Sequence, residues 1–177
     1  MSFQVAEALE ILERTPQVLR QLLAGVSGSW ASARERDDSW SLFDIVGHLI
    51  HGENTDWIPR ARIILKDGKT TPFAPFDRFA QRETSAGKTL GEVLGVFAEL
   101  RAQNVQTLQK MHLTPEQLRL EGTHPELGTV TLEELLATWV VHDLNHINQI
   151  TRALAARYRE SVGPWNHPDY LRILQGT

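Results

Sequence analysis

Apolar residues recur every three to four positions in four long segments of the chain, which is the pattern of amphipathic helices. In the first segment, residues 3–24, the apolar side is formed by Val5, Leu9, Leu12, Leu19, Leu22 and Leu23. The second segment is expected to begin with Ser41 as N-cap and to end at Lys66, before Asp67-Gly68. Pro16 and Pro59 lie inside these two patterns, where we expect a kink or bend.

The third and fourth segments each open with a capping box, a threonine followed three residues later by a glutamate. Thr89 begins the third, which is expected to reach about Met111, and Thr131 begins the fourth, which is expected to reach about Tyr158. The fourth carries an apolar stripe formed by Leu132, Leu135, Leu136, Trp139, Ile147, Ile150 and Leu154. Short helical turns are expected at residues 114–116 and 168–174.

The connections are expected at residues 25–39, 67–88 and 124–128. The second is long for a compact domain and contains Phe73, Phe76 and Phe79, so we expect it to pack over the body of the protein, near the mouth of a site. No segment shows a convincing alternation of apolar and polar residues, which would mark a strand. The pattern therefore predicts an all-α four-helix bundle with short extra helical turns, in one domain spanning residues 1–177.

Composition narrows the classes of function. The chain has 177 residues, a net charge of −4 and scattered basic residues, which argues against a nucleic-acid-binding surface. It lacks a membrane-spanning apolar run and the start of a signal peptide. It also lacks cysteine, so any thiol chemistry would need a thiol from a cofactor. We expect a cytoplasmic protein that acts on a small molecule, with neither a nucleic-acid nor a membrane partner.

Three histidines carry the strongest chemical signal. His142 and His146 lie one turn apart in the fourth helix and project from the same face, while His48 lies in the second helix at the edge of its apolar stripe. The simplest alternative is a pair of ordinary helix histidines, since chance spacing gives such a pair in roughly a quarter of comparable chains. Burial of two unpartnered imidazoles is costly, however, which favours a shared role as metal ligands.

A three-histidine site leaves a coordination position open and suits zinc first, with nickel, iron or copper as alternatives. His51 is a competing candidate, either as a fourth ligand or as an acid or base beside the metal, although a solvent-facing position is favoured. Three further histidines lie in expected loops or helix ends and are expected at the surface: His112, His124 and His167. Of these, His124 could line the entrance of a site.

Residues around these histidines suggest supporting roles. The acceptors for the second ring nitrogens are expected among Asp44, Asp143, Asn145 and Asn148. Glu53 and Asp56 could supply a general base, although a solvated helix face is the favoured interpretation for both. The dinucleotide, P-loop, nucleophile-elbow and zinc-protease motifs are absent.

In their order and spacing, several short motifs resemble the DinB/YfiT-like superfamily. The first motif is Trp40-Ser41, which precedes the helix that carries His48-Leu49. The second is Gly128-x-x-Thr131-Leu132, which precedes the helix that carries His142-Asp143-x-x-His146 and Gln149-Ile150. The last are the closing Tyr158-Arg159 and Gly163-Pro164-Trp165. Together they span about residues 3–174. The resemblance implies an up-down-down-up bundle in which His48, His142 and His146 hold a divalent metal. Relatives include homodimers and transferases or isomerases that use mycothiol, bacillithiol or glutathione.

Two functional hypotheses follow. The first is a metal-dependent enzyme that activates a low-molecular-weight thiol, as an S-transferase, or water, as a hydrolase. The second is a non-catalytic, dimeric helical scaffold in which the metal is structural. A metal-free nucleic-acid binder ranks below both because of the acidic balance of charge. Fold alone does not choose between these chemistries.

Overall fold

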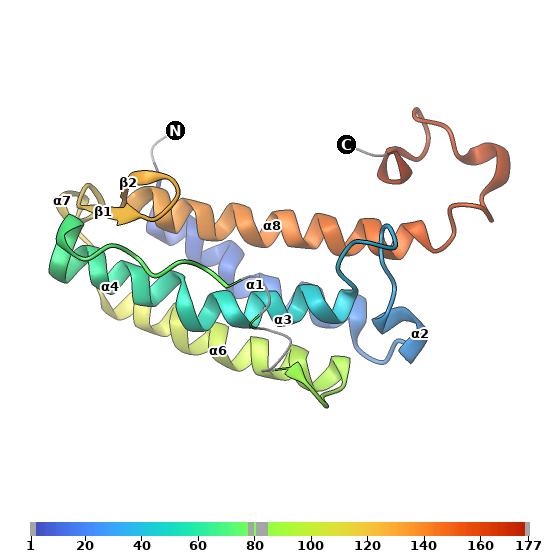
Figure 1. The fold of residues 1–177 in the computed structure, drawn as a ribbon, viewed down its shortest axis with the longest axis horizontal. Coiled ribbons are helices and arrows are strands. Elements are labelled where there is room, and N and C mark those ends of the chain that lie inside the picture. Colours follow the sequence, from blue (N-terminus) through green and yellow to red (C-terminus); the bar gives the residue numbers. More distant parts are fainter. Residues whose placement is uncertain (1–2, 78–79, 81–84, 176–177) are drawn as a thin grey trace.

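Four long helical segments lie side by side in the computed structural model, which describes residues 3–77, 80 and 85–175 (Figure 1). They are α1 (Val5–Leu23), α3 (Leu42–Thr55) continued by α4 (Trp57–Asp67), α6 (Leu90–Lys110) and α8 (Leu132–Ala156). The shorter helical turns are α2 (Gly28–Ala31), η1 (Gly68–Thr70), α7 (Pro115–Leu118), η2 (Gly163–Trp165) and η3 (Arg172–Leu174). The prediction of a four-helix bundle is confirmed.

The direction of the helices explains the longest connection. Helices α1 and α8 run one way along the bundle, whereas α3–α4 and α6 run the other way (Figure 1). Because α4 and α6 are successive and parallel, the chain between them has to return along the length of the bundle. That connection includes Phe73 and Phe76; Phe79 lies outside the described residues.

Helix starts follow the local sequence closely. Ser41, Thr89 and Thr131 each accept a hydrogen bond from the backbone N–H three residues later, and the acidic side chain there accepts one from the backbone N–H of the cap residue. Each box satisfies backbone donors that a helix start leaves unpaired. Helix α1 continues through Pro16, whereas Pro59 coincides with the break after Thr55, because a proline ring clashes with the carbonyl four residues earlier.

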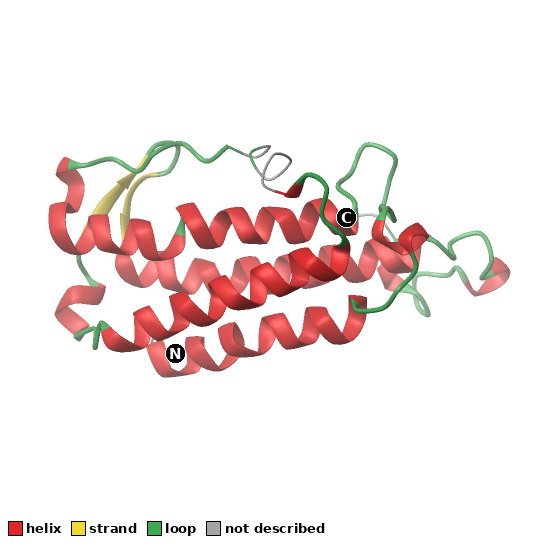
Figure 2. Ribbon diagram, turned by 90° about the horizontal axis from the view of Figure 1, so that it is seen from below, coloured by secondary structure: helices red, strands yellow, loops and turns green. Residues whose placement is uncertain are grey.

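A β-hairpin replaces part of an expected connection. Strands β1 (Glu121–His124) and β2 (Gly128–Thr131) pair antiparallel, with Gly122 opposite Val130 (Figure 2). The expectation that residues 124–128 form a plain connection and that strands are absent was wrong in this detail. Each strand has only four residues, and glycine and histidine within them weaken the alternation that marks a strand.

The bundle core is divided by a polar layer. One apolar cluster includes Leu19, Ile50, Phe97 and Ile150, and a second includes Leu12, Trp57, Val105 and Trp139. Between the two clusters, α3, α6 and α8 contribute buried polar side chains: His48, Glu53, Arg101, Asp143 and His146. Such groups are buried only when they have partners or a function, so this layer is where the candidate chemistry lies.

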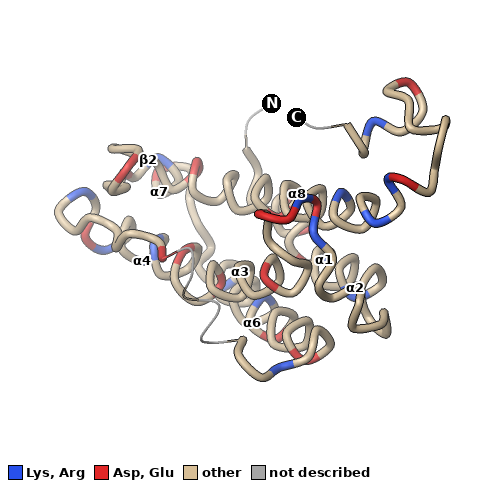
Figure 3. The backbone as a smooth tube through the Cα atoms, turned by 45° about the vertical axis from the view of Figure 1, so that its right-hand side comes forward, with Lys and Arg blue, Asp and Glu red and all other residues tan. Residues whose placement is uncertain are grey.

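Charged residues of both signs occur along the described helices. Basic and acidic residues are interspersed over the helices (Figure 3). Within the part of the chain that is described, none of the helices combines the length and apolar character needed to cross a membrane.

Candidate metal centre

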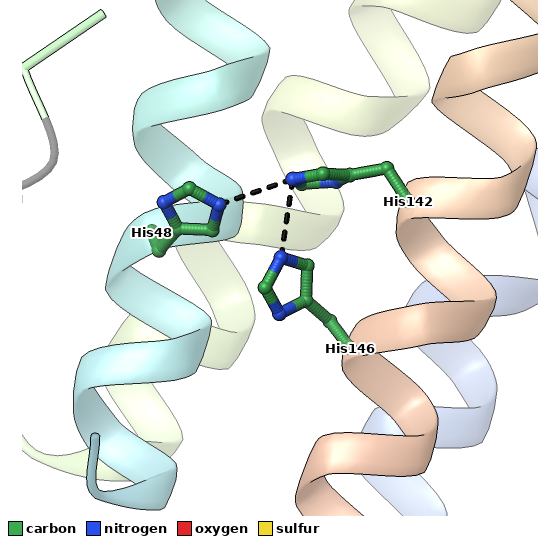
Figure 4. A group of neighbouring side chains, drawn as sticks. All are labelled: His48, His142 and His146. Carbon is green, nitrogen blue, oxygen red and sulfur yellow. Dashed lines mark hydrogen bonds between the residues drawn. The ribbon is translucent and has the colours of Figure 1, made fainter. Parts of the chain in front are cut away.

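The three expected histidines converge on one point. His48 projects from α3, while His142 and His146 project from successive turns of α8 (Figure 4). The Nε2 atom of His142 lies 3.0 Å from Nε2 of His48 and 3.1 Å from Nε2 of His146. Among the described residues, these three form the one group of side chains whose ligand atoms suit a metal ion, all within 4.8 Å of one another.

This geometry fits a divalent metal. Nitrogens bound tetrahedrally to zinc at about 2.0–2.1 Å would lie roughly 3.3 Å apart. The two measured Nε2 separations are a few tenths of an ångström shorter, so small side-chain rotations would accommodate an ion. The Nδ1 atom of His142 is buried and has no hydrogen-bond partner among the described residues, so the polar contacts of this ring are made through Nε2, the atom that faces the other two imidazoles.

Protonation also favours ligation. Burial, together with the neighbouring His146, His48 and Arg101, lowers the pKa of His142 to about 2. Burial likewise lowers the pKa of His146, although its hydrogen bond to Gln149 opposes the shift. His142 and His146 are therefore neutral at physiological pH, which leaves lone pairs available for a metal.

A hydrogen bond sets the orientation of one ligand. His146 Nδ1 donates to Oε1 of Gln149 at 2.8 Å, so its Nε2 carries the lone pair that faces His142. Gln149 was not among the expected acceptors. Asp44 instead belongs to the capping box of α3, and Asp143 binds Arg101.

Aromatic rings surround the three imidazoles. Trp40 lies 4.8 Å from His48 between ring centroids, and Phe76 meets His48 edge-on at 5.2 Å. Trp57 meets His142 edge-on at 5.1 Å. These rings limit the access of water and lower the local dielectric, which strengthens any charge held at the centre.

The histidines form part of the wall of a cavity of about 520 Å³, a size typical of small-molecule sites. The cavity extends from the three imidazoles to the β-hairpin, where His124 and Leu127 line it. Phe73 and Phe76 of the long connection also line it. The long connection and His124 therefore both line the cavity, in agreement with the expectation that they lie beside a site; that His124 marks its entrance stays a prediction.

A buried charge pair lies in the same wall. Arg60 Nη2 is 2.8 Å from Oδ1 of Asp56. Burial nevertheless raises the pKa of Asp56 to about 6, because it outweighs the attraction of Arg60. The favoured expectation of a solvated Asp56 was wrong: the break between α3 and α4 turns this residue towards the cavity.

Comparison with known proteins places this fold and site in a family. Residues 11–150, which include all three histidines, match the model of the DinB superfamily. The chain belongs to the DinB superfamily. The resemblance inferred from its motifs is thereby confirmed.

Two similar proteins of known structure share the fold. A protein of Bacillus subtilis named "Putative metal-dependent hydrolase YfiT" is 28% identical over 146 residues, covering 81% of this chain and 80% of YfiT. Its structure, described as a probable metal-dependent hydrolase with an unusual four-helix bundle topology, matches with a TM-score of 0.73 at 27% identity, over 90% of this chain and 88% of that one. TT2238, a four-helix bundle protein, matches with a TM-score of 0.56 at 22% identity, over 84% and 98% of the two chains; it supports the fold alone.

Behind its histidines, this DinB-superfamily chain has a fully buried ion network. Arg101 binds both Glu53 and Asp143 and also donates to the carbonyl of Leu12. Glu53 further accepts hydrogen bonds from Asn104 and Trp139. The favoured expectation of a solvated Glu53 was therefore wrong, and its role as a general base is also disfavoured, because both carboxylate oxygens already have partners.

The network had a signal in the sequence. Arg101 falls four residues after Phe97 and four before Val105, a core position of the apolar stripe. Asp143 falls four residues after Trp139 in the same way. A charged residue at a core position on each of several helices predicts a buried ion network.

The other histidines lie apart from the metal candidates. His51 packs against Phe76 at 4.6 Å between centroids and does not join the converging group. It is half-buried, and burial lowers its pKa, so the favoured solvent-facing position is correct only in part. His167 is exposed, and so is His112, which lies just beyond the end of α6 and has a positive φ.

Proposed function

We propose that this protein is a divalent-metal-dependent hydrolase whose metal is held by His48, His142 and His146. The convergence of three Nε2 atoms in the wall of a cavity carries the proposal. Three protein ligands are the number typical of catalytic zinc, and structural zinc usually has four. The name of the relative YfiT supports the hydrolase class.

A bound divalent metal would supply the Lewis acidity that lowers the pKa of a nucleophile at the open side of the site. Zinc is the first choice, with nickel or iron as alternatives. The remaining work falls to residues of the chain. Gln149 orients His146, the rings of Trp40 and Trp57 restrict water, and the cavity holds the substrate beside the imidazoles.

A thiol S-transferase would use the same residues with a different nucleophile. The chain contains no cysteine, so the thiol would be a small molecule that enters the cavity. Cobalt-substituted protein distinguishes the cases, because a thiol that binds the metal adds a charge-transfer band in the near ultraviolet. A cobalt spectrum that changes with neither thiols nor small anions would instead favour a closed, structural site in a non-catalytic scaffold.

Metal analysis tests the proposal directly. After loading with Zn²⁺ and dialysis, the protein should hold about one ion per chain, because one set of three ligands binds one ion. The variant His142→Ala should lose this ion. His167→Ala, which removes an exposed histidine, is the matched control and should keep the ion. His51→Ala should also keep it. Full retention of zinc by His142→Ala would contradict the assignment of the ligands.

The assembly and the compartment stay predictions. We propose a homodimer, as the family resemblance implies, and a cytoplasmic location. Sedimentation velocity of the metal-loaded protein tests the first, since a monomer and a dimer of a 20.0 kDa chain are readily separated.

A further inference from the structure

Among the buried arginines of the described chain, Arg60 and Arg101 differ in how many of their N–H groups have an acceptor. All three nitrogens of the Arg101 guanidinium have acceptors, and its side chain lies inside the bundle. Arg60 is almost as deeply buried, with 9% of its side chain exposed. Its contacts involve Nη2 alone, however: the ion pair with Asp56 and a hydrogen bond of 3.5 Å to the carbonyl of Ala74.

Arg60 therefore has spare donors. A guanidinium carries five N–H groups, and those on Nε and Nη1 have no acceptor among the described residues. The ring of Phe73 packs 5.2 Å from the guanidinium carbon, which covers one face of the group and leaves its edge for hydrogen bonds. Neither nitrogen is among the enclosed, unpartnered atoms of the described chain, and Arg60 lines the cavity, so both can donate to a molecule held there.

Asp56, the partner of Arg60, is also incompletely hydrogen-bonded. Its Oδ1 is buried and lacks a hydrogen-bond donor in the described chain, although Arg60 Nη2 lies 2.8 Å away, because the N–H does not point at it. The raised pKa of Asp56 agrees with weak compensation. Asp56 also lines the cavity. The other oxygen, Oδ2, is not among the enclosed atoms, so an accessible acceptor and accessible donors lie next to each other in one wall.

The charge of the cavity argues against an anion at this place. Arg60 is the one cationic side chain among the described lining residues, and it is already balanced by Asp56. Two further carboxylates line the same cavity, Glu126 and Glu134. A neutral group with a carbonyl beside an N–H fits better, since the carbonyl can accept from Arg60 while the N–H donates to Asp56.

The position of the pair suits a second contact with the same molecule. Asp56 and Arg60 follow His48 by eight and twelve residues along α3 and α4, which corresponds to roughly 12 and 18 Å along a helix. The wall between them is aromatic, with Trp57 and Phe76. A molecule with an apolar middle could therefore reach the imidazoles with one end and the pair with the other.

We propose that Asp56 and Arg60 form a second polar subsite of the cavity, which binds a carboxamide-like group of the molecule whose reacting end faces the three histidines. This proposal rests on the proposed function only in assigning the reacting end of the bound molecule to the three histidines. The subsite itself depends on α4 and can be tested with or without metal.

Three aryl compounds of similar size test the subsite: benzamide, N,N-dimethylbenzamide, which lacks the N–H, and benzoate, which is anionic. Binding is followed by NMR titration of the Trp57 indole N–H, on metal-loaded protein and on protein stripped of metal so that benzoate cannot bind through the ion. Benzamide is expected to bind about tenfold more tightly than either analogue, which corresponds to one hydrogen bond.

Variants assign the preference to the pair. Arg60→Met and Asp56→Leu are each expected to reduce the benzamide preference to less than about twofold, because each removes one partner of the amide. The double variant Arg60→Met/Asp56→Leu replaces both charges with apolar groups and guards against a single variant that fails to fold. Arg62→Met, at an exposed arginine of α4, is the matched control and should keep the full preference.

The outcomes separate the two proposals. Tighter binding of benzoate to the stripped protein would make the pair an anion site and overturn the inference, as would equal binding of all three compounds. A benzamide preference in protein that binds no metal would support the subsite while refuting the proposed function. Metal binding without any benzamide preference would refute the subsite alone.

Discussion

His142 lies where a protonated imidazole would face two other imidazoles and the guanidinium of Arg101. Burial and these neighbours together lower its pKa to about 2. The same surroundings that make it a neutral ligand make it sensitive to acid when the metal is absent. In an unfolded chain the imidazole titrates near its ordinary pKa of about 6.5, so protons favour the unfolded state below that pH.

The resulting prediction concerns acid stability. Between pH 6.5 and 5, the unfolded chain binds a proton at His142 that the folded chain excludes, so stability falls with falling pH by about 1–2 kcal/mol from this group. Urea unfolding of metal-stripped protein at both pH values measures the loss. His142→Gln should show a smaller loss, and His167→Gln should match the wild type. Equal losses in the wild type and in His142→Gln would contradict the buried neutral state.

At the level of elements, three segments meet at the end of the cavity that is opposite the histidines. The backbone N–H of Phe73 donates to the carbonyl of Thr123 at 2.9 Å, which joins the long connection to β1. Gly122 of the same strand lies against α4, and a Cβ there would come within 2.7 Å of Ile64 and 2.9 Å of Phe73. Glycine therefore permits the close approach of the hairpin that completes the cavity.

A matched pair of glycine substitutions tests this contact. Gly122→Ala is expected to destabilise the protein by about 1–3 kcal/mol, because the added methyl group overpacks the contact. Gly95→Ala, in α6 with no atom within 4 Å of the added Cβ, should stabilise it by about 0.5–1 kcal/mol through helix propensity. Urea unfolding measures both. A Gly122→Ala variant as stable as the wild type would show that the hairpin is not held closely against α4.

Across the whole molecule, the ion network of Arg101 joins the four long helical segments. The guanidinium contacts Leu12 of α1, Glu53 of α3 and Asp143 of α8 from its own position on α6. Because Asp143 follows His142 directly, the network also holds the backbone of α8 behind the metal candidates. Breaking one member of such a network leaves a buried charge without compensation.

Loss of Arg101 should therefore affect the whole fold. Arg101→Met is expected to lower the free energy of unfolding by about 3–5 kcal/mol, because Glu53 and Asp143 stay buried without their cation. Arg62→Met, which removes an exposed charge, should change it by less than about 0.5 kcal/mol. Replacing both carboxylates as well, with Glu53→Gln and Asp143→Asn, should restore part of the loss. A loss below about 1 kcal/mol in Arg101→Met would contradict the role of the network.

The sequence by itself determined the features that depend on near neighbours along the chain. The capping boxes at Ser41, Thr89 and Thr131 use residues three apart, and the shared face of His142 and His146 follows from helical spacing. The bundle class followed from apolar periodicity in the same way. These interactions are local, so they do not depend on which distant segments the helices pack against.

Tertiary packing decided the features that join distant residues. It brought Nε2 of His48 to His142, 94 residues away, buried Glu53 against Arg101, and turned Asp56 and Arg60 towards the cavity. The family resemblance anticipated the first of these, but periodicity alone shows only which face of a helix is apolar, not which face of another helix it meets. In the three-histidine centre, the pairing of His142 with His146 thus follows from helical spacing along α8. The position of His48 depends on tertiary packing, because this residue comes from a separate helix.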